Sequence, residues 1–534
     1  MSRALLVVNA RPWSGSPLAA DAVLVRDGAI EAVGRADGLR AAAADARVVD
    51  ACGATVTPGL TDAHLHLVPW ARARRQPDLH GTPTCADALE VVARALAALP
   101  PGDAPLVGRG WDETGWAVAP HRDALDALAP RRPVVLHRHD FHALWVNTAA
   151  LRAAGVTSST PDPDGGVYER DAEGELTGVV REHAVRAFAA LEERAAPALD
   201  DALLDEAAAA LHALGVTAVH DYQREAGDRA LMRALAGRRR LRVLQMVGID
   251  AVRAAGVLGL AAGSGDDWFR IGGLKLFADG TLGSRTAAML APYEDRGGLG
   301  MALIPPSELR DLVGEAAAAG FPITVHAIGD AAVRATLDAV EAHRDAVAGL
   351  PFPPRVEHVQ LLDPADRARF RALGVIASMQ PQHATTDAVV ARTAWGERCV
   401  NAYPWRDLLA EGVVLAFGSD APVEPPVPAL GLAAAVGRVG GDGRPFTPAQ
   451  RLTLDEALVA YTRGAALAAG ERFGPGTLTP GAPGDLVVWD RDLHGADLAA
   501  LAAAAPRLTT LAGRIVYESP VRAVPSGPSP GEGA

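Results

Sequence analysis

Two histidines, His64 and His66, are separated by one residue in the segment Thr55-Val-Thr-Pro-Gly-Leu-Thr-Asp-Ala-His-Leu-His-Leu67. On a β-strand, residues i and i+2 project from the same face, so both imidazoles point the same way. Neutral imidazole is the commonest nitrogen ligand of Zn²⁺-type cations. A His-x-His pair taken alone is more often structural than metal-binding, so a metal site needs further ligands from other parts of the chain.

Those further ligands are found near the ends of other apolar segments, in the residues Lys275, His326, His358 and Asp420. Each has an ordinary interpretation by itself: a half-buried histidine that is hydrogen-bonded, or an aspartate that caps a turn. Lys275 is harder to explain in this way, because an unpaired ammonium inside an apolar segment is costly. One metal site accounts for all of these positions together.

The lysine has a specific chemical use. Burial lowers the pKa of a lysine and exposes the neutral amine, which can add CO₂ to become a carbamate. A carbamate can bridge two metal ions about 3.5–4 Å apart. We therefore predict a binuclear centre in which His64, His66 and Asp420 hold one cation, His326 and His358 hold the other, and carboxylated Lys275 bridges them.

The middle of the chain alternates short apolar strands with amphipathic helices, the pattern of a parallel sheet. We expect strands at 55–67, 215–222, 242–249, 271–279, 322–330, 355–362, 374–381 and 413–422. We expect helices at 200–214, 226–238, 307–319, 330–343, 364–373, 404–411 and 454–469, and a weaker one at 251–263. Eight strands with alternating helices predict a (β/α)₈ TIM-type barrel, whose active site lies at the carboxyl ends of its strands.

Both chain ends are rich in short strands, with Asp27-Gly28 as a hairpin signal. They predict a composite β-sandwich domain from residues 1–54 and 475–518, beside a barrel domain over 55–474. The segment 68–199 is too long for a βα crossover, so it is expected to be an inserted subdomain that caps the substrate. Residues 519–534, rich in Pro, Gly and Ser, are expected to form a disordered tail.

Composition excludes several function classes. The chain has 534 residues, of which 49% are hydrophobic and 22% charged, and a net charge of −13. An acidic chain without basic runs argues against nucleic-acid and membrane partners. Three scattered cysteines, Cys52, Cys85 and Cys399, and no apolar segment of membrane-spanning length predict a cytoplasmic protein. Large α/β proteins often form symmetric oligomers, so a homodimer is one expected assembly.

Several motifs resemble the amidohydrolase superfamily, in its two-metal, carboxylated-lysine class, and within it the N-substituted formamide deformylase-like branch (amidohydrolase family 3). They are Pro58-Gly-Leu-Thr-Asp-Ala-His-Leu-His66, Leu274-Lys-Leu-Phe-Ala-Asp-Gly-Thr-Leu-Gly-Ser-Arg-Thr286, Val325-His-Ala-Ile-Gly-Asp330, Arg355-Val-Glu-His-Val-Gln360, Gly418-Ser-Asp420 and Pro480-Gly-Ala-Pro-Gly-Asp-Leu-Val-Val-Trp489. The resemblance covers nearly the whole chain, and no predicted ligand position departs from it.

The resemblance implies a metal-dependent hydrolase that cleaves a non-peptide carbon–nitrogen bond of a small molecule, an N-formyl or N-acyl amine. A metal-bridging hydroxide would attack the carbonyl, and Asp420 would act as general base and then general acid. Zn²⁺ suits the ligand set, and Mn²⁺, Fe²⁺ or Co²⁺ are alternatives. Hydrolysis of a cyclic amide or an ester is an alternative reaction on the same site. A metal-assisted isomerase and a non-catalytic scaffold are the remaining alternatives.

Substrate contacts are expected from the Gly-rich loop after the lysine strand and from the insertion. The candidates are Trp111, Asp112, His142, Ser284 and Arg285, although the two loop residues could equally form a tight turn. The pair His137 and His139 is expected to be structural, and His220 and Asp221 to support the site from outside. The remaining histidines, at positions 80, 121, 183, 212, 343, 383 and 494, are mostly expected on the surface or in loops, His383 being the least certain.

Overall fold

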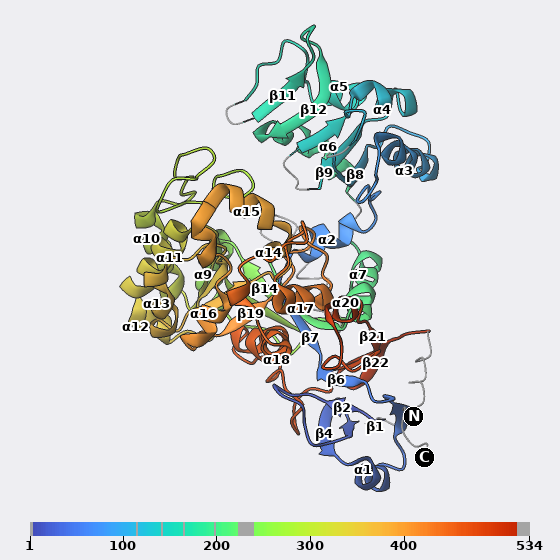
Figure 1. Cartoon of the computed structure of the whole chain (residues 1–534), viewed down its shortest axis with the longest axis vertical. Coiled ribbons are helices and arrows are strands. Elements are labelled where there is room, and N and C mark those ends of the chain that lie inside the picture. Colours follow the sequence, from blue (N-terminus) through green and yellow to red (C-terminus); the bar gives the residue numbers. More distant parts are fainter. Residues whose placement is uncertain are drawn as a thin grey trace, which may run out of the picture. The chain divides into compact units, whose positions relative to one another are not determined.

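A computed structural model describes residues 4–113, 116–139, 143–163, 166–196, 199–222 and 240–520 of the chain. The chain divides into two compact units, one made of Met1–Leu67 with Asp205–Ala534 and the other of Val68–Leu204 (Figure 1). The first unit holds the barrel and the β-sandwich, and the second is the segment inserted after the first barrel strand. The expected fold class is confirmed.

Eight strands form the sheet at the centre of the first unit, in the order β19-β18-β17-β16-β15-β14-β13-β7. All neighbours are parallel. A parallel bridge between Leu65 and Ala421 joins the two outer strands and closes the barrel. The strands are β7 (Leu60–Leu65), β13 (Val216–Asp221), β14 (Arg242–Val247), β15 (Phe269–Phe277), β16 (Ile323–Ala327), β17 (Arg355–His358), β18 (Ile376–Met379) and β19 (Leu415–Phe417).

The first predicted strand, 55–67, is in fact two strands. β6 (Thr55–Pro58) pairs with β20 of the sandwich, whereas β7 pairs with β13 of the barrel. The chain changes sheets at Gly59, where a Cβ atom would lie 2.2 Å from Thr217 Oγ1. A residue without a side chain is therefore required where the two sheets approach each other, and a hydrophobic pattern does not reveal that break.

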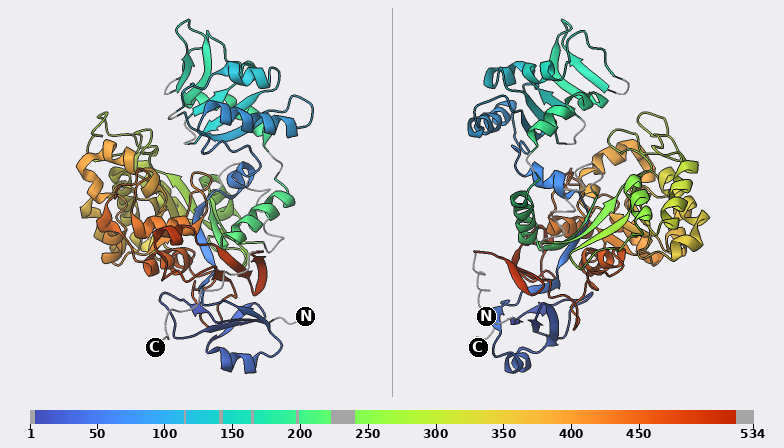
Figure 2. Two further views of the ribbon diagram at one scale, coloured as in Figure 1. Left: turned by 45° about the vertical axis from the view of Figure 1, so that its right-hand side comes forward. Right: turned by 180° about the vertical axis from the view of Figure 1, so that it is seen from behind.

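Helices accompany the strands on the outside of the barrel, as Figure 2 shows for α10 to α13. The helices of this part are α7 (Asp201–Ala213), α9 (Ile249–Val257), α10 (Pro306–Ala318), α11 (Asp330–Ala342), α12 (Arg344–Ala348), η2 (Pro364–Asp366), α13 (Arg367–Ala372), α16 (Trp405–Ala410), α17 (Pro428–Gly437), η4 (Pro448–Gln450), α18 (Leu454–Val459) and α19 (Ala465–Ala468). The helix predicted over 226–238 lies outside the described residues. Residues of α9 to α13 and of α16 to α18 share one large apolar core with residues of β14 to β19.

Three helical predictions need correction. The helix expected over 251–263 ends at Val257, because Gly259 and Gly263 adopt positive φ values of 69° and 85°. The one over 454–469 is interrupted by a π-helical turn, Ala460–Gly464, where a Cβ on Gly464 would come 2.0 Å from Leu415 O. No helix was predicted between 382 and 403, where the structure has α14 (His383–Thr386), α15 (Ala388–Trp395) and η3 (Gly396–Asn401).

The β-sandwich joins both ends of the chain, since its two sheets share a core that includes Val7, Val25, Val56 and Val488. The first sheet has the order β4-β3-β1-β5 and the second β2-β6-β20-β21-β22. Their remaining elements are β1 (Ala4–Val8), β2 (Arg11–Pro12), β3 (Ala22–Arg26), β4 (Ala29–Gly34), α1 (Ala36–Ala42), β5 (Arg47–Asp50), β20 (Leu486–Trp489), α20 (Leu498–Ala502), β21 (Pro506–Leu511) and β22 (Arg514–Glu518). Asp27-Gly28 forms the predicted tight hairpin turn, with φ values of 50° and 90°.

The inserted unit has its own five-stranded sheet, in the order β11-β12-β10-β9-β8. Successive residues of β9 alternate between two apolar clusters, Val134 and Leu136 in one and Val135 in the other, so both faces of the sheet are covered. Its elements are α2 (Leu67–Ala73), α3 (Cys85–Ala98), β8 (Leu106–Trp111), α4 (Arg122–Leu128), β9 (Val134–Arg138), β10 (Ala143–Val146), α5 (Thr148–Ala153), β11 (Gly166–Arg170), β12 (Leu176–Glu182), η1 (His183–Phe188) and α6 (Ala189–Ala195).

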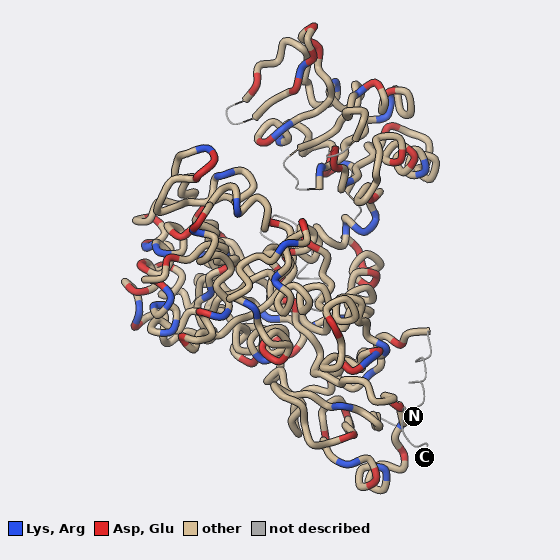
Figure 3. The backbone as a smooth tube through the Cα atoms, in the orientation of Figure 1, with Lys and Arg blue, Asp and Glu red and all other residues tan. Residues whose placement is uncertain are grey.

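Basic and acidic residues are interspersed along both units (Figure 3). Cys52, Cys85 and Cys399 are free thiols. Among the described residues, no helix combines the length and the apolar character needed to span a membrane. The predicted tail over 519–534 falls almost wholly on residues outside the described part, which ends at 520.

Candidate metal centre

The six predicted ligands gather at the carboxyl ends of the barrel strands. His64, Lys275, His326 and His358 lie on β7, β15, β16 and β17, and His66 and Asp420 follow the ends of β7 and β19. Five of the six are no more than 9% exposed. The His66 side chain is 26% exposed, so it lies at the solvent side of the group.

His64, His66 and Asp420 form one compact cluster, in which the ligand atoms all lie within 4.8 Å of one another. Asp420 Oδ1 is 3.2 Å from His66 Nε2 and 3.5 Å from His64 Nε2. Backbone hydrogen bonds set this geometry, because Asp420 N donates to His64 O (2.7 Å) and His66 N donates to Ala421 O (2.9 Å). The first and last barrel strands therefore deliver their ligands to one point.

Asp62, on β7, stabilises the contact between the ends of β7 and β19. Its carboxylate accepts hydrogen bonds from Ser419 N (2.9 Å) and Ser419 Oγ (2.6 Å). A Cβ on Gly418 would come 2.3 Å from His64 N, so only glycine allows this close approach. Asp420 itself has φ 60°, a left-handed conformation that costs about 1–3 kcal/mol in a non-glycine residue. The Gly-Ser-Asp motif thus serves to turn one carboxylate towards the two histidines.

In His64, His326 and His358, one ring nitrogen contacts an oxygen acceptor of the protein. His64 Nδ1 contacts Glu357 Oε2 (2.7 Å), and His358 Nδ1 contacts Gln380 Oε1 (2.7 Å). His326 Nε2 contacts Gly280 O (2.9 Å). Because each partner is an oxygen acceptor, the anchored nitrogen carries the proton and the opposite nitrogen keeps its lone pair. This is the tautomer that a metal-binding histidine needs.

Glu357 organises the most buried part of the group, and the sequence analysis missed it. Besides His64 it accepts hydrogen bonds from Tyr222 Oη (2.6 Å) and Thr324 Oγ1 (2.7 Å). The Tyr222 ring stacks on His64 with the ring centroids 3.8 Å apart. The only sequence signal was a carboxylate inside an apolar strand, directly before His358.

Adjacent residues of a regular strand point to opposite faces, yet Glu357 and His358 both serve the centre. The reason is local backbone geometry, since His358 and Val359 have φ values of 73° and 45°. This departure from strand geometry turns the His358 ring inward, to a centroid distance of 5.0 Å from His64 and 4.5 Å from His326.

Burial keeps these histidines neutral at physiological pH. It lowers the pKa of His64 to about 4 and that of His326 to about 3, and the charge of Lys275 adds to the second shift. Burial also lowers the pKa of His358. Burial opposes ionisation of Asp420, but the neighbouring His64 and the hydrogen bond with His66 hold its pKa well below its usual range. Neutral imidazoles and an ionised carboxylate are the ligand forms of these groups.

Lys275 is 3% exposed and lies among aromatic rings and the histidines. Its Nζ atom is 4.7 Å from the Tyr222 ring centroid and 4.5 Å from that of Phe277. Its side chain also lies close enough to His326 and His358 to act on both of them. The donor set of imidazoles and a carboxylate fits divalent cations.

His383 is the main correction to the predicted residue list. It was expected on the surface or in a loop, but it is 6% exposed and lies beside the centre. With His358 and Asp420 it forms a second group whose ligand atoms lie within 4.8 Å of one another. His212, also expected near the surface, is 6% exposed. Both predictions failed because they were made without knowing the tertiary contacts of the helices that carry them.

The predicted substrate contacts of the insertion are not supported by their surroundings. Trp111 is fully buried in the core of its own unit and donates from Nε1 to Leu136 O (2.8 Å), so its ring is not available to a ligand. Asp112 forms an ion pair with Arg138 (3.1 Å). His142 lies outside the described residues.

Ser284 and Arg285 form part of the turn that follows β15. Ser284 Oγ contacts Thr286 Oγ1 (2.6 Å), and Arg285 pairs with Asp295 (2.6 Å). Their side chains therefore help to hold the loop, and their contact with substrate stays a prediction. Asp279 fixes the same loop, accepting hydrogen bonds from the amides of Ala288 and Gly329 (2.9 and 2.8 Å).

The other polar residues near these strands have structural contacts. His220 Nδ1 contacts Arg355 (2.9 Å), and Asp221 accepts a hydrogen bond from Leu67 N (2.8 Å). In the inserted unit, His137 pairs with Glu192 (3.0 Å) and His139 lies 3.8 Å from Asp112.

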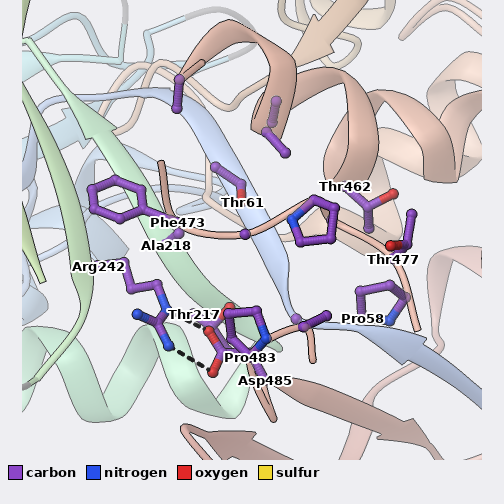
Figure 4. Close-up of a pocket in the computed structure, with 18 of the residues that line it drawn as sticks. Pro58, Thr61, Thr217, Ala218, Arg242, Thr462, Phe473, Thr477, Pro483 and Asp485 are labelled. Carbon is purple, nitrogen blue, oxygen red and sulfur yellow. Dashed lines mark hydrogen bonds and ion pairs between the residues drawn. The ribbon is translucent and has the colours of Figure 1, made fainter. Parts of the chain in front are cut away.

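A cavity lies at the opposite, amino ends of the barrel strands (Figure 4). Arg242, at the start of β14, donates to both carboxylate oxygens of Asp485 (2.6 and 3.1 Å) and to Asp267 O (2.8 Å). Asp485 also accepts from Ala512 N (2.7 Å). The charged groups of this cavity therefore satisfy one another and fasten the sandwich to the barrel.

A (β/α)₈ barrel with this donor set at the carboxyl ends of its strands belongs to the class of metal-dependent hydrolases. The chain is a member of the amidohydrolase family, whose model matches residues 47–517. Membership of this family makes it a metal-dependent hydrolase.

Relatives match along almost the whole chain. N-substituted formamide deformylase of Arthrobacter pascens is 31% identical over 520 residues, which cover 92% of this chain and 94% of that protein. Protein LONG AFTER FAR-RED 3 of Arabidopsis thaliana is 32% identical over 502 residues, covering 88% and 85%. The crystal structure of an uncharacterized metal-dependent hydrolase from Pyrococcus horikoshii is 26% identical, with a TM-score of 0.76, covering 93% of this chain and 99% of that one.

Proposed function

We propose that this protein hydrolyses a small linear amide, an N-formyl or N-acyl amine, at a binuclear metal centre. The observation that carries the proposal is the position of Asp420, whose carboxylate lies 3.2 and 3.5 Å from the Nε2 atoms of His66 and His64. The similarity to N-substituted formamide deformylase supports the choice of a formyl or acyl amide.

In this proposal His64, His66 and Asp420 would hold one divalent cation, and His326 and His358 would hold a second. Lys275, carboxylated on Nζ, would supply a ligand to both. Zn²⁺ is the proposed metal because the set combines imidazole nitrogen and carboxylate oxygen, with Mn²⁺, Fe²⁺ and Co²⁺ as the other candidates. Bound cations of this kind supply Lewis acidity and make hydroxide available near neutral pH.

Asp420 carries out the proton transfers of the reaction. It accepts the proton of the hydroxide that adds to the carbonyl carbon and delivers it to the leaving nitrogen as the carbon–nitrogen bond breaks. One water is consumed, and a carboxylate and an amine are released. Glu357 and Gln380 hold His64 and His358 in the tautomers that this arrangement requires.

The test combines metal analysis with a substrate panel. Purified protein is assayed against N-formyl amines, N-acetyl amines, cyclic amides and esters, and its metal content is measured in the same preparation. We expect about two metals per chain and the highest kcat/KM on the linear amides. Exclusive activity on cyclic amides or esters would contradict the substrate class, and fewer than one metal per chain in active protein would contradict the binuclear centre.

The cytoplasmic location and the homodimer are untested and remain predictions. The substrate-capping role of the inserted unit is also a prediction.

A further inference from the structure

His383 is a buried imidazole for which the proposed metal centre has no use. It begins α14, directly after β18, and is 6% exposed. Among the described residues, neither of its ring nitrogens has a hydrogen-bond partner. A buried polar side chain without a partner is rare, and at a functional site it indicates a group that binds something other than the protein.

Its position relative to Asp420 is specific. His383 Nε2 lies 4.0 Å from Asp420 Oδ2, whereas Asp420 Oδ1 faces His64 and His66. A separation of 4.0 Å is too long for a hydrogen bond, so the imidazole faces the carboxylate without binding it. The ring lies roughly parallel to that of His358, with the centroids 6.1 Å apart.

The carboxyl groups near His383 form hydrogen bonds with residues other than His383. Two carboxyl groups, those of Asp387 and Glu424, lie near His383. However, Asp387 accepts a hydrogen bond from Tyr403 Oη (2.6 Å), and Glu424 accepts one from Thr386 Oγ1 (2.8 Å). Neither carboxyl group anchors the imidazole.

His383 differs from three of the predicted ligands in its hydrogen bonds. His64, His326 and His358 each have one nitrogen held by Glu357, Gly280 O or Gln380. Histidines that bind metals almost always have such a contact, because it fixes the tautomer and the ring orientation. Within the described part of the chain His383 has none, so its surroundings suit a group that engages the substrate.

We propose that His383 is a catalytic residue whose Nε2–H donates a hydrogen bond to the oxygen of the scissile carbonyl. That oxygen gains negative charge as hydroxide adds to the carbon, so a donor placed in advance stabilises the transition state more than the substrate. The inference rests on the proposed amide hydrolysis, and it adds a contact that the metal ligands do not supply.

The test compares His383→Ala, His383→Gln and a matched control, His212→Gln. His212 is equally buried and its Nε2 also lacks a partner, but it lies on α7, and no contact with the six predicted ligands is seen in the described part of the chain. We expect kcat/KM on the best linear amide to fall by about 10²- to 10³-fold in His383→Ala, with partial recovery in His383→Gln, whose amide still donates. His212→Gln should behave like the parent protein.

Two readouts do not depend on the substrate. Metal content per chain should be the same in all three variants. Inorganic phosphate, a tetrahedral oxyanion, is titrated into Co²⁺-loaded protein and followed by its visible absorption, and its Kd should rise at least about tenfold in His383→Ala.

Each contrary result is informative. Loss of about one metal per chain in His383→Ala would make His383 a ligand and overturn the proposal. Unchanged kcat/KM and unchanged phosphate affinity would show that it contacts neither substrate nor oxyanion. If the parent protein cleaves no linear amide, the proposed function fails, whereas the phosphate titration still decides whether His383 is an oxyanion donor.

Discussion

The two ends of the barrel both contain buried polar groups, but those groups are arranged in opposite ways. At the amino ends, Arg242 and Asp485 satisfy each other and the surrounding backbone (Figure 4). At the carboxyl ends, His64 and His358 each use Nδ1 for a contact with the protein, and Asp420 is held in a left-handed conformation. The first arrangement is complete without a ligand, and the second is not.

This difference indicates what each end is for. A buried ion pair destabilises the fold when one partner is removed, whereas backbone strain persists only where the surroundings enforce it. Active sites of TIM barrels lie at the carboxyl ends, and the opposite end serves stability. Substitutions at the two ends should therefore affect different measurements, activity at one and unfolding at the other.

The largest effect on activity should come from Lys275. In Lys275→Ala the proposed carbamate cannot form, so metal content should fall and turnover should drop to the limit of detection. A short carboxylate such as acetate can occupy the vacated space and should restore part of both. Lys275→Arg is the control that keeps a positive charge but cannot be carboxylated. Full metal content and normal turnover in Lys275→Ala would exclude the carbamate.

Asp420→Asn should lower kcat by about 10²- to 10⁴-fold, because the amide cannot accept the proton of the attacking hydroxide. Much of the metal should remain bound, since the histidines are unchanged. Asp27→Asn is a matched control, because Asp27 also has a positive φ, 50°, but lies in the β3–β4 turn of the sandwich. Steady-state kinetics with metal analysis distinguish the two. Normal turnover in Asp420→Asn would refute its assigned role.

A smaller effect is expected when Glu357 is replaced by glutamine. The His64 ring then loses its charged anchor, and metal affinity should fall by about 10- to 100-fold, as measured by competition with a chelator. Excess metal should restore most of the activity, which separates loss of metal from loss of catalysis. Glu341→Gln, on an exposed side chain, provides the control. An unchanged affinity would mean that the Glu357 contact does not hold the ligand in place.

The smallest effect on turnover is expected at the amino end. Asp485→Asn breaks a buried ion pair whose side chains are 5% and 11% exposed, and should lower the free energy of unfolding by about 3–5 kcal/mol. Turnover of the folded protein should not change. The exposed pair of Arg253 and Glu315 gives the control, Glu315→Gln, which should cost less than about 1 kcal/mol. Denaturant unfolding and steady-state kinetics are measured on both variants. A loss of kcat in Asp485→Asn would contradict the division between an end that serves activity and an end that serves stability.

Much of the fold could be predicted because barrel strands are short apolar segments in a regular alternation with helices. Two errors in the predicted elements arose where the backbone approaches a distant part of the chain closely. The division of 55–67 at Gly59 and the π turn at Gly464 depend on close approaches to Thr217 and Leu415. Hydrophobic periodicity carries no information about such contacts, because they involve residues far apart in the chain.

The predicted metal ligands could be found because their residue types at strand ends are chemically unusual, and the barrel brings strand ends together. His64, His66, Lys275, His326, His358 and Asp420 were identifiable in this way. The groups that orient them were not, since Glu357 and Gln380 acquire their roles only through contacts across strands. Trp111 shows the opposite error, because a tryptophan in a polar motif is indistinguishable in sequence from one in a core.

Residue types and their order were therefore enough to indicate the class of chemistry, since metal ligation depends on which side chains are present near strand ends. The tertiary structure was needed for the tautomer of each histidine, for the inward turn of His358, and for the place of His383. These depend on hydrogen bonds and backbone angles that arise only when strands distant in sequence pack together.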